Sequence, residues 1–248
     1  MTDAAQTFEK ELEVLGAEAK AAAKFLYAHQ AIHGAAARHT EVEVLLNTAP
    51  LFWETTLSAL QASAFIALGR VFDESKDSHG IARLLRLAIA SPEIFMRDAL
   101  AARKQGNSPI KPEWLDEFIA ASYEPSRSDF EFIQQKTSEI KTLYDQKYKP
   151  IRNKIYAHKD IKGNAKVHEL FAQTNIDEWQ TLILFPQSLY NALRQLFDNG
   201  NRPTLREHPH AIADMISKPI PPGQQVPSYE EVAHETAEFL RTVAKGKS

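Results

Sequence analysis

The stretch SRSDFEFIQQKTSEIKTLYDQKYKPIRNKIYAHKD, residues 126–160, decides the fold. Its core-type residues advance in steps of three and four, which places them on one face of a helix: Phe130, Ile133, Thr137, Ile140, Tyr144, Tyr148, Ile151 and Ile155. Ser126 or Ser128 can cap the start of this helix. Pro150 lacks an amide hydrogen and crowds the preceding turn, so we expect the helix to bend or restart there.

Helical periodicity continues on both sides of this stretch. Only nine residues are glycine, and no run alternates between apolar and polar residues as a half-buried strand would. Thr40 and Glu43 have the spacing of a capping box, Gly34 is expected to end the helix before them, and Pro50 predicts a kink or a new helix start. The chain is therefore predicted to be all-α, with its other main helices at Thr7–His33, Thr40–Asp73, Ile176–Asp198 and Ser228–Ala244.

Composition divides the chain into three parts. Six of the thirteen prolines fall between residues 199 and 227, which predicts an extended strap before the last helix. We expect an N-terminal helical extension at residues 1–39, a helical bundle at 40–200, and a proline-rich segment with a C-terminal helix at 201–248.

The absence of cysteine excludes disulfides, thiolate metal sites and thiol nucleophiles, and it favours the cytoplasm. Thr55–Gly69 is among the longest uncharged stretches and is shorter than the roughly 18–20 residues that span a bilayer, so we expect neither export nor membrane insertion. No phosphate-binding loop, dinucleotide loop, zinc-protease motif or nucleophile elbow is present, which disfavours most familiar enzyme classes.

Charge is distributed unevenly along the chain. The net charge is −3, yet residues 136–166 hold nine basic and three acidic side chains, a balance of +6, so the remainder carries −9. Lys147, Lys149, Lys154 and Lys159 could bind the phosphates of an RNA strand, and Tyr144, Tyr148 or Tyr156 could stack on a base. The competing interpretations are a solvated basic helix and tyrosines that belong to the core.

Arg152 and His158 are the pair best suited to chemistry. Arginine can hold a phosphate through two hydrogen bonds, and histidine can transfer a proton near neutral pH. On a helix, however, the two residues stand about 120° and about 9 Å apart, and Arg152 leans away from His158. We therefore expect two copies of the helix to bring Arg and His together in a two-fold dimer.

Structural interpretations of the same residues stay open. His158 on an apolar face could be a core histidine, and Arg152 could be a solvated side chain. Arg202 and His208 repeat the spacing, but within the proline-rich segment. His29 and His33 could share a metal ion, but no carboxylate cluster accompanies them in the sequence, and we expect neither a metal nor a cofactor.

Two separated segments resemble the HEPN superfamily, specifically its AbiU-like branch from phage abortive-infection systems. The first is PIRNKIYAHKD at residues 150–160, and the second is LGRVFDES at residues 68–75, followed by Ile81 and residues 83–85. Both fall on predicted helices and occur in the family's order. The resemblance extends over roughly residues 40–200.

The resemblance implies a HEPN-like helical bundle that acts as a metal-independent endoribonuclease in phage defence or as a toxin of a toxin–antitoxin pair. It implies a homodimer with a composite site of Arg152, Asn153 and His158, with RNA as substrate and an antitoxin or regulatory protein as partner. Asp160 stands where nucleotidylated HEPN toxins have tyrosine, so control by a nucleotidyltransferase is not expected. The alternative, from another functional class, is a non-catalytic helical dimer that binds protein or RNA.

Overall fold

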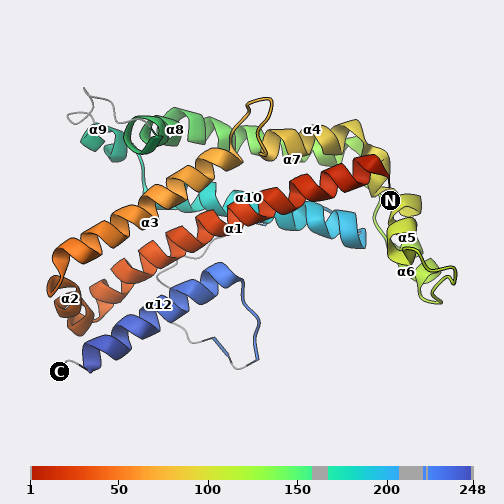
Figure 1. Ribbon diagram of the computed structural model, residues 1–248. Coiled ribbons are helices and arrows are strands. Elements are labelled where there is room, and N and C mark those ends of the chain that lie inside the picture. Colours follow the sequence, from red (N-terminus) through yellow and green to blue (C-terminus); the bar gives the residue numbers. More distant parts are fainter. Residues whose placement is uncertain (1, 158–166, 207–219, 222, 247–248) are drawn as a thin grey trace. The chain divides into compact units, whose positions relative to one another are not determined.

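The computed structural model describes residues 2–157, 167–206, 220–221 and 223–246, and in these residues the chain is all-α, without strands (Figure 1). The α-helices are α1 (Asp3–Arg38), α2 (Thr40–Asn47), α3 (Pro50–Val71), α4 (Ile81–Ala90), α5 (Arg97–Gln105), α6 (Leu115–Ala121), α7 (Arg127–Leu143), α8 (Lys149–Ile151), α9 (Val167–Ala172), α10 (Ile176–Asn199) and α12 (Ser228–Lys245). A 3₁₀ turn, η1 (Pro92–Phe95), and two π-helical turns, η2 (Tyr144–Tyr148) and η3 (Arg152–Ala157), complete them.

The expectation that Gly34 ends the first helix is wrong. Helix α1 runs through this residue to Arg38. A glycine inside a helix costs only about 1 kcal/mol relative to alanine. Ala31, Ile32 and Ala35 are buried around it, so packing offsets that cost.

The predicted capping box at Thr40 is also wrong, whereas the predicted helix start at Pro50 is confirmed. His39 alone separates α1 from α2 and adopts an extended backbone, so Thr40 is already helical and no side chain caps the start of α2. The amide of His39 still donates to the carbonyl of Ala35 at 3.0 Å. Pro50 begins α3, where its missing amide hydrogen would be unsatisfied in any case.

The long helix predicted from Ser126 is confirmed at its start and interrupted as expected at Pro150. Ser126 and Asp129 form a reciprocal capping box at the start of α7. Beyond Leu143 the chain passes through η2, the short α8 and η3, so wide turns lie on both sides of Pro150. Proline cannot donate to the carbonyl one turn earlier, and such a gap in the ladder favours π-type turns, which often occur at functional positions.

The chain forms two compact units, each assembled from segments that are distant in sequence. Unit 1 comprises residues 1–17, 70–146 and 184–207, and unit 2 comprises residues 18–69, 147–183 and 208–248. These boundaries arise from contacts between segments, whereas the expected division at residues 40 and 200 follows composition and stays a prediction.

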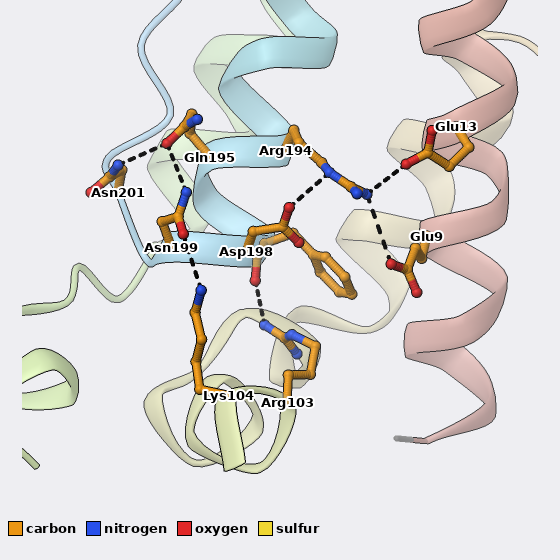
Figure 2. A network of polar contacts seen from close by, with 10 residues as sticks. Glu9, Glu13, Arg103, Lys104, Arg194, Gln195, Asp198, Asn199 and Asn201 are labelled. Atoms are coloured by element: carbon orange, nitrogen blue, oxygen red, sulfur yellow. Dashed lines mark hydrogen bonds and ion pairs between the residues drawn. The ribbon is translucent and has the colours of Figure 1, made fainter. Parts of the chain in front are cut away.

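Four phenylalanines from separate segments form the core of unit 1. The ring of Phe8 lies 5.0 Å from that of Phe95 and 5.2 Å from that of Phe197, and Phe95 lies 5.3 Å from Phe130. A polar network secures the end of α10, where Arg194 contacts Glu13 at 2.9 Å and Asp198 at 2.7 Å (Figure 2).

Phe65 on α3 is the centre of the aromatic core in unit 2. Its ring centroid lies 5.2 Å from Tyr156, 5.4 Å from Trp179 and 6.0 Å from Tyr148. The C-terminal helix α12, predicted from the sequence, also belongs to this unit, and its Tyr229 meets Tyr27 of α1 at 5.1 Å. This core holds α3, η2 and η3 together, and η3 carries the predicted site.

Helix α3 is long and apolar enough to cross a membrane by length and composition alone, a property that core helices share. Its first half exposes Leu51 (77%) and Phe52 (62%), while its second half contributes Phe65 and Leu68 to the buried residues. The expectation of no membrane partner stays a prediction.

Candidate functional site

Arg152 opens the π-helical turn η3, directly after the interruption at Pro150. The side chain is half-buried, and its Nη1 donates a hydrogen bond to Oδ1 of Asn153 at 2.8 Å. Its Nε is fully buried and has no hydrogen-bond partner among the described residues. The two neighbouring residues singled out in the sequence are therefore in direct contact, and the amide of Asn153 orients the guanidinium.

The other side of Arg152 faces Gly69 on α3. Gly69 is buried, and a Cβ atom placed on it would come within 2.7 Å of Nε of Arg152. Heavy atoms in ordinary van der Waals contact lie about 3.5 Å or more apart. The arginine therefore occupies space that is open only because residue 69 has no side chain.

Aromatic side chains pack one helical turn away from the contact between Gly69 and Arg152. Phe65 precedes Gly69 by four residues on α3, and Tyr148 and Tyr156 lie four residues before and after Arg152. Phe65 contacts both tyrosine rings. Helix α3 therefore packs against residues 148–156 with the large side chain of Phe65 at one turn and with Gly69, which has no side chain, at the next. This arrangement determines the spacing between α3 and η3 at Arg152.

The tyrosines take part in this packing. Tyr148 is buried and donates from its hydroxyl to the carbonyl of Asn175 at 3.0 Å. Tyr156, predicted to stack on RNA, is half-buried against Phe65, and burial raises its pKa to about 12. The ring of Tyr156 thus makes core contacts in this structure, as the structural interpretation of the sequence anticipated.

The lysines of this segment differ in their surroundings. Lys147 is partly buried and donates to Oε1 of Glu178 at 2.5 Å, which places its charge in an ion pair. Lys149 and Lys154 are exposed on either side of Arg152. A guanidinium and two exposed ammonium groups within six residues supply the kind of donors that bind phosphate oxygens.

The remaining predicted site residues are placed as follows. His158 and Lys159 lie outside the described residues, as does His208 of the second Arg–His spacing. The rings of His29 and His33 lie in contact, with centroids 4.7 Å apart and planes tilted by 56°. Among the residues that the structure describes, no group of three or more histidines and carboxylates could hold a metal ion.

Gly69 is the residue that the sequence analysis did not single out. It lies within one of the two segments that resemble HEPN proteins, but only as part of a matching pattern. A glycine in a helix interior is unfavourable, and it often marks a position where another group approaches closely. That signal was present in the sequence, but the approaching group could not be identified from it.

A protein-family model matches most of the chain. The family model HEPN AbiU2, described as AbiU2, matches residues 5–215, a longer range than the 40–200 over which the resemblance was noticed. No curated protein and no solved structure matches the chain.

Proposed function

Since the chain belongs to the AbiU2 family of HEPN proteins, we propose that it is a metal-independent endoribonuclease of phage-defence or toxin–antitoxin type. It would act in the cytoplasm as a homodimer, with Arg152, Asn153 and His158 at a composite site. The observation that carries the proposal is the Arg152 guanidinium, oriented by Asn153 on an irregular turn between two exposed lysines.

In this mechanism the nucleophile is the 2′-hydroxyl of the RNA itself. His158 of one subunit removes its proton as the oxygen–phosphorus bond forms. The bond to the 5′ oxygen breaks, and this oxygen takes up a proton from solvent water. The products are a 2′,3′-cyclic phosphate and a 5′-hydroxyl. Arg152 stabilises the charge that develops on the phosphate oxygens, Asn153 holds the guanidinium, and Lys149, Lys154 and Lys159 bind neighbouring phosphates.

Cleavage of total RNA by the purified protein in excess EDTA tests this function. We expect the wild-type chain to cut RNA, and both Arg152→Ala and His158→Ala to lower the rate by about 10²- to 10⁴-fold. Matched controls are Arg127→Ala and His39→Ala. Arg127 is 92% exposed and lies in unit 1, so its loss should leave the rate unchanged.

The nature of the cut provides a second criterion. An RNA with 2′-O-methyl groups throughout should be resistant, because the attacking hydroxyl is blocked. Equal cleavage by the wild type and both site variants would indicate a contaminating nuclease and contradict the proposal. Absence of cleavage by a folded wild-type dimer that still binds RNA would favour the non-catalytic RNA-binding module.

A further inference from the structure

The contact between Gly69 and Arg152 extends from Cγ to Nε of the arginine side chain. A Cβ on Gly69 would lie 2.7 Å from Nε, 3.3 Å from Cδ and 3.4 Å from Cγ of Arg152. Gly69 has no positive φ, so an alanine could adopt the same backbone conformation. A glycine is thus needed here because it has no side chain, and not because of its backbone conformation.

Two neighbours therefore define where the guanidinium lies. Gly69 leaves room for the buried Nε of Arg152, and Oδ1 of Asn153 accepts a hydrogen bond from Nη1 of the same guanidinium. The aromatic contacts of Phe65 with Tyr148 and Tyr156 prevent α3 from moving aside, since Phe65 is only 2% exposed and sits one turn from Gly69. A methyl group at residue 69 would displace the arginine before it displaced the helix.

We infer that Gly69 is a positioning residue for Arg152. The inference rests on the proposed function where it concerns RNA cleavage, and on geometry alone where it concerns the arginine. An alanine at 69 would push the guanidinium outward by roughly 0.7 Å or more to restore van der Waals distances. A displacement near 1 Å at a catalytic group can lower the rate by about 10²-fold, so we expect kcat to fall by roughly 10- to 100-fold.

The first test does not depend on activity. In protein labelled with ¹⁵N-arginine, the Nε–H resonance of Arg152 is assigned by its disappearance in Arg152→Lys. In Gly69→Ala we expect this resonance to shift and its hydrogen to exchange faster with solvent, because Nε leaves its buried position. The control Gly246→Ala adds the same methyl where the nearest atoms lie at 3.7 Å, and it should leave the resonance unchanged. An unchanged Arg152 resonance in Gly69→Ala would overturn the inference.

The second test is a double-mutant cycle on RNA cleavage in EDTA. Gly69→Ala should lower kcat with little change in KM, and it should have no further effect when Arg152→Ala is already present. Additive losses in the double variant would show that Gly69 acts elsewhere. Thermal unfolding of each variant checks that it is folded, because the helix preference of alanine and the contact of its methyl group with Arg152 act in opposite directions on stability.

The two proposals can fail separately. If the wild type cuts no RNA but the Arg152 resonance responds to Gly69→Ala as expected, the positioning contact is correct and the ribonuclease proposal is wrong. If the wild type cuts RNA and Gly69→Ala alters neither kcat nor the resonance, the ribonuclease proposal stands and the positioning role is wrong.

Discussion

At the scale of single residues, His29 in unit 2 has an unusual environment. Its ring is half-buried, 5.7 Å from Trp179 and 4.7 Å from His33. Burial and then repulsion from His33 lower its pKa to about 4 from an ordinary value of 6.5. The folded protein therefore keeps His29 neutral at pH values where the unfolded chain would bind a proton.

This shift predicts a loss of stability in acid. Between about pH 6.5 and pH 4 the unfolded chain binds a proton at residue 29 that the folded chain does not, so the free energy of unfolding falls as the pH falls through this window. Partial exposure limits the effect to about 1–2 kcal/mol between pH 7 and pH 5. Urea unfolding at both pH values should show that His29→Gln loses less stability in acid than the wild type by this amount.

A matched substitution makes the comparison specific. His39→Gln removes a histidine outside the Trp179 contact, where the nearby carboxylate is Glu41 at 3.6 Å. It reports what the same chemical change does elsewhere in the chain. An identical pH dependence for the wild type and His29→Gln would show that His29 is not held neutral by folding.

At the scale of elements, the start of α7 depends on one carboxylate. Asp129 accepts hydrogen bonds from the amide of Ser126 at 2.8 Å, from its hydroxyl at 2.7 Å and from the hydroxyl of Tyr123 at 2.8 Å. Partial burial acts to raise the pKa of Asp129, but the hydrogen bonds from Ser126 and Tyr123 and the charge of Arg202 outweigh it and lower the pKa. The helix start is therefore most stable with this carboxylate ionised.

Replacement of Asp129 by alanine should reduce the free energy of unfolding by about 1–2 kcal/mol at pH 7, because the cap and the Tyr123 contact are both lost. The lowered pKa of Asp129 stabilises the folded state at pH values above 3.8, the pKa in the unfolded chain. This contribution disappears as the pH falls through the lower pKa of the folded state. Urea unfolding should thus give a constant difference between wild type and Asp129→Ala from pH 5 to pH 8, and a smaller one below about pH 4.

The control lies two residues further along α7. Glu131 pairs with Arg127 at 2.8 Å, but both side chains are largely exposed, so Glu131→Ala should cost less than about 0.5 kcal/mol. A cost for Asp129→Ala no larger than that for Glu131→Ala would contradict the capping argument.

At the scale of the whole molecule, the proposed site requires two chains. On an ideal helix, residues with the spacing of Arg152 and His158 would lean apart, which is the reason for proposing that each Arg152 acts with His158 of the partner subunit. Co-expression of Arg152→Ala and His158→Ala chains with different tags allows the mixed dimer to be purified. This dimer retains one intact Arg–His pair of two, so we expect about half of the wild-type cleavage rate.

The homodimers of each variant serve as the controls, and both should be nearly inactive. A mixed dimer as inactive as its parents would show that Arg152 and His158 act within one chain. A wild-type protein that keeps the mass of a monomer at high concentration would exclude a shared site altogether.

Local patterns predicted the helices well, and their errors were local too. Periodicity located α7, α10 and α12, because the burial of one helix face constrains residues three and four apart. The signals for helix ends failed at two positions. At Gly34, packing outweighed the weak preference of glycine to end a helix, and at Thr40 the one-residue connection His39 took the cap position. The sequence offered Ser126 or Ser128 as the cap of α7, and the structure shows Ser126, which pairs with Asp129 three residues later.

The sequence by itself determined the all-α class, the interruption at Pro150, and the side-by-side position of Arg152 and Asn153, since each depends on neighbours within about one helical turn. Only the tertiary structure decided that Gly69 makes room for Arg152, that Tyr156 packs on Phe65, and that each compact unit draws on three separate segments. The first two features join residues more than eighty positions apart, and all three follow from which side chains fit together in space, a property that no local periodicity contains.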